Sequence, residues 1–245
     1  MTTPTPTPKP KLAIQIAMPI EAQGIIEALD LQAMPDYFDA RLPLKAYQRA
    51  DLPELLLVVN GDCPQHGCAR VGTQAAAVAA WEIIRVFKPD LLLSAGTAGG
   101  FSERSEIGEV FLSEACFSYH GRDIPVPGFA EYERGRYPAY EVPGLAEALA
   151  VRTAKISTSD TIRSSELELA RLAEENITCK EMEAASIAEV AMLTHTPFFA
   201  LKVVTDFIDQ PEDMAEQFVE NFQLAINHLA SKVLATIAFL GFIPA

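Results

Sequence analysis

Short apolar runs alternate with stretches of helical spacing along the chain beyond its first ten residues. Runs with the length of buried strands lie at residues 11–18, 55–59, 91–95, 110–117 and 198–204, and a further strand begins at Ile156. Apolar residues at helical spacing follow at residues 20–29, 71–87, 181–193 and 214–240. Strands that alternate with helices predict a single α/β domain built on a central sheet.

Ligands of such sheets bind at the carboxyl ends of the strands. In this chain these ends lie after Met18, at Gly96–Gly100, after Ile156 and at Thr205–Asp206. The Gly-Thr-Ala-Gly-Gly segment lets backbone approach a ligand closely. It is neither a dinucleotide fingerprint nor a P-loop, so it does not indicate a nucleotide phosphate.

The two ends of the chain and one internal stretch stand apart from the strand and helix pattern. Residues 1–10, MTTPTPTPKP, predict a disordered tail, which leaves 11–245 as the folded domain. Residues 119–143 are rich in Pro, Gly, Tyr and charge and predict a long functional loop. The apolar run from Val233 is too short to span a bilayer and reads as the end of a packing helix.

Charge and cysteine content narrow the choice of partners and compartment. A formal net charge of −14 repels phosphate backbones and anionic lipids, so nucleic acid and membranes are poor partners. A small neutral or zwitterionic substrate is expected instead. The four cysteines form no CxxC pair and have no His at zinc-site spacing, which predicts reduced thiols in the cytoplasm. Neither a metal nor a cofactor is expected, because the four histidines are scattered and no HExxH motif occurs.

Asp206 and Glu21 are the candidate acid and base. Asp206 follows the run FFALKVVT, and a carboxyl at the end of a buried strand is desolvated, which raises its pKa and suits it to deliver a proton near neutral pH. Glu21 lies just past the first strand, where a carboxylate could activate water. Taken alone, each position is more often an ordinary helix start, where acidic residues are favoured.

A second acidic pair lies in the segment Lys180–Ala185. Glu181 and Glu183 flank Met182, and alternate positions of an extended segment point the same way, so both could converge on a sugar diol. A solvated acidic helix start is the alternative. No GxSxG elbow is present, which argues against a serine hydrolase.

Taken together, these segments resemble the 5′-methylthioadenosine/S-adenosylhomocysteine nucleosidases of the nucleoside phosphorylase superfamily. HGRDIPVP and LKVVTDFID are most similar to the plant-type branch, which prefers methylthioadenosine. The matching stretches occur in family order and are IAMPIEAQ (16–23), KPDLLLSAGTAGGF (88–101), IGEVFLSEACFSYHGRDIPVP (107–127), ISTSDTI (156–162), KEMEAASIAEVA (180–191) and LKVVTDFID (201–209).

This resemblance implies a three-layer αβα fold with a mixed twisted sheet, and hydrolysis of the N-glycosidic bond of 5′-methylthioadenosine. S-adenosylhomocysteine and 5′-deoxyadenosine share its adenine and ribose and are further possible substrates. Asp206 would protonate adenine N7 and Glu21 would activate the water that attacks C1′. The other expected contacts are Met182 and Glu183 at the ribose, Glu181 as a supporting acid, Thr97 near the water and sugar, Ile162 stacked on adenine and Arg163 with its backbone at the base edge.

The resemblance also implies a homodimer, since a second subunit completes the apolar pocket for the 5′ group. Candidates for that pocket are Met18, Ile124, Met214 and Phe218. Arg163 departs from the family, in which many members carry an apolar residue at this position.

Two alternatives remain open. A phosphorylase of the same fold would bind phosphate with an Arg after the first strand, but this chain has AMPIEAQG there, with Glu21 in place of a cation. A non-catalytic storage protein of this fold would not require both the acid and the base.

Overall fold

The computed structural model describes residues 9–122, 124–210 and 214–244, with the side chain of Met214 outside that description. Of the predicted tail, only residues 9 and 10 fall within it. The strands are β1 (Leu12–Ile16), β2 (Gln32–Ala33), β3 (Lys45–Arg49), β4 (Leu52–Val59), β5 (Leu91–Gly100), β6 (Val110–Tyr119), β7 (Tyr137–Pro138), β8 (Arg152–Thr158), β9 (Cys179–Glu181) and β10 (Phe198–Phe207). The helices are α1 (Pro19–Ala28), α2 (Thr73–Phe87), α3 (Ala130–Arg134), α4 (Leu145–Leu149), α5 (Glu166–Glu174), α6 (Ala184–Leu193) and α7 (Met214–Phe239).

The strands form one mixed sheet that closes on itself at one end. On its open side β1 pairs in parallel with β4 and β5, and β3 and β2 continue the sheet beyond β4 in antiparallel pairing. On the other side β5 pairs with β10, β10 with β6, β6 with β8, β8 with β9, and β9 returns to β5. These five strands make a ring, so β5 hydrogen-bonds to strands of both parts of the sheet.

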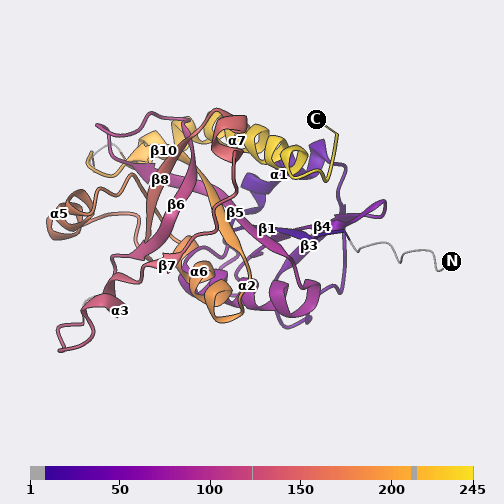
Figure 1. Cartoon of the computed structure of the whole chain (residues 1–245), viewed down its shortest axis with the longest axis horizontal. Coiled ribbons are helices and arrows are strands. Elements are labelled where there is room, and N and C mark those ends of the chain that lie inside the picture. The colour runs from indigo at the N-terminus through magenta and orange to yellow at the C-terminus, as the bar shows by residue number, and fades with distance from the viewer. Residues whose placement is uncertain (1–8, 123, 211–213, 245) are drawn as a thin grey trace.

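Helices cover both faces of the sheet (Figure 1). α7 packs on β10, α1 and α4, while α2 and α6 pack against each other across the other face. Each face has its own apolar cluster: Ile14, Leu93 and Leu229 belong to one, and Ala80, Phe111 and Ile187 belong to the other. The predicted α/β architecture with helices on either side of a central mixed sheet is therefore confirmed, and closure of the ring is an additional feature.

Helix α7 has one buried face. Residues 215–239 are long and apolar enough to cross a membrane by length and composition alone. Ala225, Leu229, Val233 and Ile237, spaced four residues apart, are fully buried against the sheet side of the domain. This spacing places them on one stripe, as in a core helix of a globular domain.

The structure differs from the sequence prediction in three segments. The strand predicted at 91–95 continues through Gly96–Gly100 as the end of β5, because β10 and β9 pair with this part of the strand. The acidic segment that was predicted as helix from residue 181 begins with β9, and α6 starts at Ala184. The predicted loop at 119–143 contains α3 and β7, although residue 123 lies outside the described residues.

Candidate active site

A cavity of about 270 Å³ opens where β1, β5, β9 and β10 end. Its position follows the rule that α/β sheets bind ligands beyond the carboxyl ends of their parallel strands. The cavity is lined by Ala17, Met18, Glu21, Val71, Thr97, Ala98, Gly99, Thr161, Ile162, Lys180, Glu181, Met182, Glu183, Thr205, Asp206, Ile208 and Phe218.

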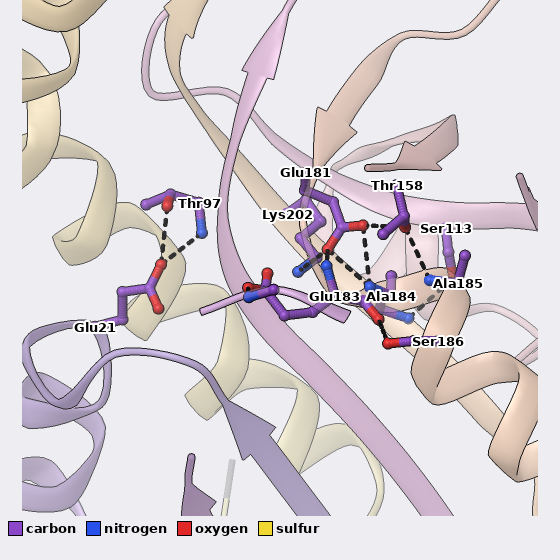
Figure 2. A network of polar contacts seen from close by, with 12 residues as sticks. Glu21, Thr97, Ser113, Thr158, Glu181, Glu183, Ala184, Ala185, Ser186 and Lys202 are labelled. Atoms are coloured by element: carbon purple, nitrogen blue, oxygen red, sulfur yellow. Dashed lines mark hydrogen bonds and ion pairs between the residues drawn. The ribbon is translucent and has the colours of Figure 1, made fainter. Parts of the chain in front are cut away.

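Glu21 lies in the first turn of α1 and is only 2% exposed. One carboxylate oxygen, Oε1, accepts hydrogen bonds from the Thr97 backbone N–H at 2.8 Å and from the Thr97 hydroxyl at 2.9 Å (Figure 2). The other, Oε2, accepts from the Met18 N–H at 3.2 Å. Burial raises the pKa of Glu21 above its usual range, although these hydrogen bonds and Lys202 oppose the effect. A fixed carboxylate with a raised pKa suits a general base.

Asp206 stands near the end of β10 and is buried. Its Oδ1 accepts a hydrogen bond from the Thr205 hydroxyl at 2.7 Å. Burial raises the pKa of Asp206, with Thr205 and Lys180 opposing. A register shift between Val204 and Asp206 brings this residue opposite Gly99 of β5. The group is therefore placed to hold a proton and deliver it into the cavity.

Gly96 and Gly99 of β5 leave space for the carboxyl groups of Glu21 and Asp206. A Cβ on Gly96 would lie 3.4 Å from Glu21 Oε1, and a Cβ on Gly99 would lie 3.0 Å from Asp206 Oδ2 and 2.5 Å from Ile208 Cγ2. The glycines predicted to let backbone approach a ligand thus also let the carboxyls of Asp206 and Glu21 pack against the strand.

Glu181 is held by a dense set of donors (Figure 2). Its Oε2 pairs with Lys202 Nζ at 2.8 Å, and its Oε1 accepts from the hydroxyl of Thr158. The backbone N–H groups of Glu183 and Ala184 also donate to it, at 2.9–3.0 Å. With its side chain fully buried, Glu181 orients the start of α6 and the Lys202 ammonium.

Glu183 has fewer partners than Glu181. Its Oε1 accepts a hydrogen bond from the Gly72 N–H at 2.8 Å, and Oε2 has no protein donor among the described residues. Burial, followed by repulsion from Glu181, raises the pKa of Glu183 to about 7. Burial lowers the pKa of Lys202, but the surrounding carboxylates Glu181, Glu183 and Glu21 outweigh it and hold that pKa above its usual value. The buried Lys202 ammonium therefore lies among three carboxyls.

The cavity brings together most of the residues that the sequence singled out. Ile162, 62% exposed, lies among its lining residues. Ile124 and Arg163 are not among them; the Arg163 carbonyl accepts a hydrogen bond from Lys180 at 3.1 Å, and the Ile124 N–H donates to Glu133 at 3.4 Å. The side chain of Met214 lies outside the described residues. The predicted residues that line the cavity are Met18, Glu21, Thr97, Ile162, Glu181, Met182, Glu183, Asp206 and Phe218.

Two buried lysines of the site were missed at the sequence level. Lys202 interrupts the apolar run FFALKVV, and a charge inside a buried strand requires a partner in space, which is a usable signal. Lys180 directly precedes the acidic pair and gave no such signal. Val71 and Ile208 line the cavity with further apolar side chains, although neither was expected there from the sequence.

Comparisons with known proteins show the family of the chain. The family model of the phosphorylase superfamily matches residues 11–238. A 5′-methylthioadenosine nucleosidase of Arabidopsis thaliana is 33% identical over 229 residues, covering 89% of this chain and 84% of the relative. A 5′-methylthioadenosine/S-adenosylhomocysteine nucleosidase of the same plant is 31% identical over 76% of this chain and 74% of the relative.

Solved structures give the same result. The apo structure of Arabidopsis thaliana 5′-methylthioadenosine nucleosidase superposes with a TM-score of 0.90 at 31% identity, covering 96% of this chain and 97% of that one. A structure of an MTA/SAH nucleosidase also reaches a TM-score of 0.90, at 28% identity and the same coverage. The chain therefore belongs to the phosphorylase superfamily and, within it, to the family of the 5′-methylthioadenosine nucleosidases.

Proposed function

We propose that this protein hydrolyses the N-glycosidic bond of 5′-methylthioadenosine, releasing adenine and 5-methylthioribose, with Asp206 as the acid and Glu21 as the base. The observation that carries this proposal is that two buried carboxyls with raised pKa values, from α1 and β10, line one cavity. Enzymes that cleave glycosidic bonds usually use two carboxyl groups, one as the general acid and the other as the general base.

The reaction divides between the two carboxyls. Asp206 gives its proton to N7 of adenine, so the base leaves as a neutral molecule while the C1′–N9 bond breaks. The ribose becomes oxocarbenium-like, and the negative carboxylate of Glu183 accepts hydrogen bonds from the 2′ and 3′ hydroxyls. Glu21 removes a proton from the water that attacks C1′. Its hydrogen bonds to Thr97 fix the direction in which that proton is taken.

Water fits this site better than phosphate as the nucleophile. Glu21, Glu181 and Glu183 surround Lys202, and its ammonium is already paired with Glu181 at 2.8 Å. An incoming phosphate dianion would meet a net negative wall in a buried setting, which is unfavourable. The site therefore supports a hydrolase over a phosphorylase.

Adenine release from 5′-methylthioadenosine, measured with and without phosphate, tests the reaction class. Equal rates in phosphate-free buffer are expected, and strict phosphate dependence would overturn the proposal. Glu21→Gln should lose most turnover because an amide cannot accept the proton of water. The matched control is Glu27→Gln, since Glu27 is exposed on the same helix.

The 5′ group of the substrate meets apolar side chains in the same proposal. Met18, Phe218, Ile208 and Val71 line the cavity, and a methylthio group is compatible with such walls. The homocysteinyl tail of S-adenosylhomocysteine carries charges whose desolvation is costly. A kcat/KM panel over 5′-methylthioadenosine, S-adenosylhomocysteine and 5′-deoxyadenosine should rank the methylthio substrate first, and a preference for the homocysteinyl substrate would contradict this assignment.

We also propose that the protein forms a homodimer through helices α2 and α6. α2 and α6 pack against each other, yet Val78, Trp81, Met192 and Leu193 of these helices are 40%, 55%, 42% and 70% exposed. Large apolar side chains exposed on adjacent helices are typical of a surface that a partner covers. Sedimentation should give a dimer at micromolar concentration, and Trp81→Glu should yield monomers. A monomeric wild type would refute this.

The cytoplasm is the proposed location, supported by the state of the cysteines. Cys63, Cys68, Cys116 and Cys179 are all free thiols in the structure, as expected where the thiol pool is reduced. Cell fractionation with an antibody against this protein tests the assignment, and recovery in a secreted or periplasmic fraction would contradict it.

A further inference from the structure

Lys180 is a buried lysine that the proposed chemistry does not use. It lies in the middle of β9, is 3% exposed and lines the cavity. Its Nζ donates to the carbonyls of Ile162 and Arg163, both at 3.1 Å, to the Ser164 hydroxyl at 2.6 Å and to the Thr161 hydroxyl at 3.4 Å. A lysine in such a place must recover the desolvation of its charge through these acceptors.

The segment that Lys180 holds is otherwise weakly anchored. Residues 161–163, between β8 and α5, are exposed to solvent. Asp160, just before them, accepts hydrogen bonds from the backbone N–H of Thr73 at 2.7 Å and from its hydroxyl at 2.6 Å. The Ser159 hydroxyl also contacts the Thr161 hydroxyl at 3.1 Å and donates to the Thr161 carbonyl at 3.4 Å, so these contacts all lie at the first end of the segment. Lys180 reaches the carbonyls in its middle, immediately beside Ile162.

We propose that Lys180 is a positioning residue for recognition of the nucleobase, and that its ammonium holds the Thr161–Ser164 segment in the conformation that receives adenine. This inference rests on the proposed function, in which Ile162 stacks on the base. One ammonium that donates to two carbonyls and two hydroxyls of consecutive residues defines the path of the segment more strictly than a single contact would. When the proton leaves, Lys180 retains fewer donors and the segment loosens.

The groups around Lys180 set the pH at which its ammonium loses a proton. Burial lowers the pKa of Lys180 to about 8, while Glu168 of α5 and Asp206 of β10 oppose that effect. His120, which follows β6, also faces this lysine; burial lowers its pKa to about 4, so it is neutral at physiological pH. Lys180 is therefore charged below about pH 8, and substrate affinity should weaken as the pH rises above that value.

The test compares Lys180→Arg and Lys180→Met with wild type between pH 6 and pH 9.5. The wild-type KM for 5′-methylthioadenosine should rise above about pH 8 while kcat changes less. Lys180→Arg keeps its charge throughout and should lack this rise. Lys180→Met should raise KM by about tenfold already at pH 7, the loss expected when a charged donor is removed. Lys155→Met, in an exposed position on β8, is the matched control and should behave as wild type.

Binding of free adenine by calorimetry separates this inference from the proposed function. A wild type that binds adenine with the same pH dependence but does not hydrolyse the nucleoside would refute the proposed function alone. A wild type that hydrolyses the nucleoside with a KM constant to pH 9.5, or a folded Lys180→Met protein with unchanged KM and adenine affinity, would refute the role of Lys180 alone. If Lys180→Met does not fold, the pH dependence of wild type and Lys180→Arg still decides.

Discussion

Replacement of Glu183 by glutamine should stabilise the fold while it weakens the enzyme. Burial and the neighbouring Glu181 raise the pKa of Glu183 to about 7, against 4.5 for an unperturbed glutamate. Between those pH values the folded protein keeps a proton at this carboxyl that the unfolded chain has released. The free energy of unfolding therefore falls as the pH rises through this window. Above it, the wild type carries the full penalty of a buried charge.

The size of this penalty follows from the pKa. At about 1.4 kcal/mol for each pKa unit, the raised pKa of Glu183 lowers the free energy of unfolding by about 3 kcal/mol at pH 8, and by about a quarter of that at pH 5. An amide retains an acceptor for the Gly72 N–H, so we expect Glu183→Gln to recover about 2 kcal/mol at pH 8, which corresponds to a Tm increase of about 4–8 °C for a domain of this size.

Thermal unfolding at pH 5 and pH 8 measures both parts of the effect. Glu147→Gln, at an exposed position on α4, is the control and should leave Tm unchanged at both pH values. The same Glu183→Gln protein should lose about 10-fold to 100-fold in kcat/KM, because the ribose hydroxyls lose a charged acceptor. A Tm at pH 8 no higher than that of wild type, or an equal gain at pH 5, would refute the reasoning.

Three further substitutions, one of them with a matched control, test the packing and chemistry of the site. Gly99→Ala should destabilise by about 1–3 kcal/mol and slow turnover, since its Cβ would lie 2.5 Å from Ile208. Gly24→Ala, whose Cβ meets only a contact at 3.5 Å, should stabilise by up to about 1 kcal/mol; equal effects in urea denaturation would contradict this. Lys202→Met should cost about 3–5 kcal/mol, measured the same way, and unchanged stability would argue against the buried pair. Asp206→Asn should lower kcat by about 10²–10⁴-fold, and near-normal adenine release would exclude it as the acid.

The sequence was sufficient to place the two main carboxyls of the candidate site. Glu21 and Asp206 each follow a buried apolar run, and runs of that kind were predicted as strands of one sheet. Because parallel strands of such a sheet present their carboxyl ends at one edge, residues far apart in the chain could be expected to meet. The structure places both in the lining of one cavity.

Other parts of the site depend on contacts that a local pattern does not carry. Gly96–Gly100 has low strand propensity, and only its pairing with β10 and β9 makes it extended. β9 itself is three residues long, too short for an alternation to be visible. The roles of Lys180 and Lys202 depend on which carbonyls and carboxylates surround them, and those acceptors come from several different elements.

Strand β5 fixes the distance between the places where two carboxyl groups of the site pack. Gly96 contacts Glu21 and Gly99 contacts Asp206, so the points of β5 on which the proposed base and the proposed acid pack are three residues apart, about 10 Å at 3.3 Å per residue. Because β5 is hydrogen-bonded on both sides, this spacing cannot be adjusted by a rotamer or a loop movement. Variation of the substrate is therefore expected to arise in the exposed segment at 161–163 and in the apolar wall of the cavity, while β5 keeps the contact points of the two carboxyls at a constant separation.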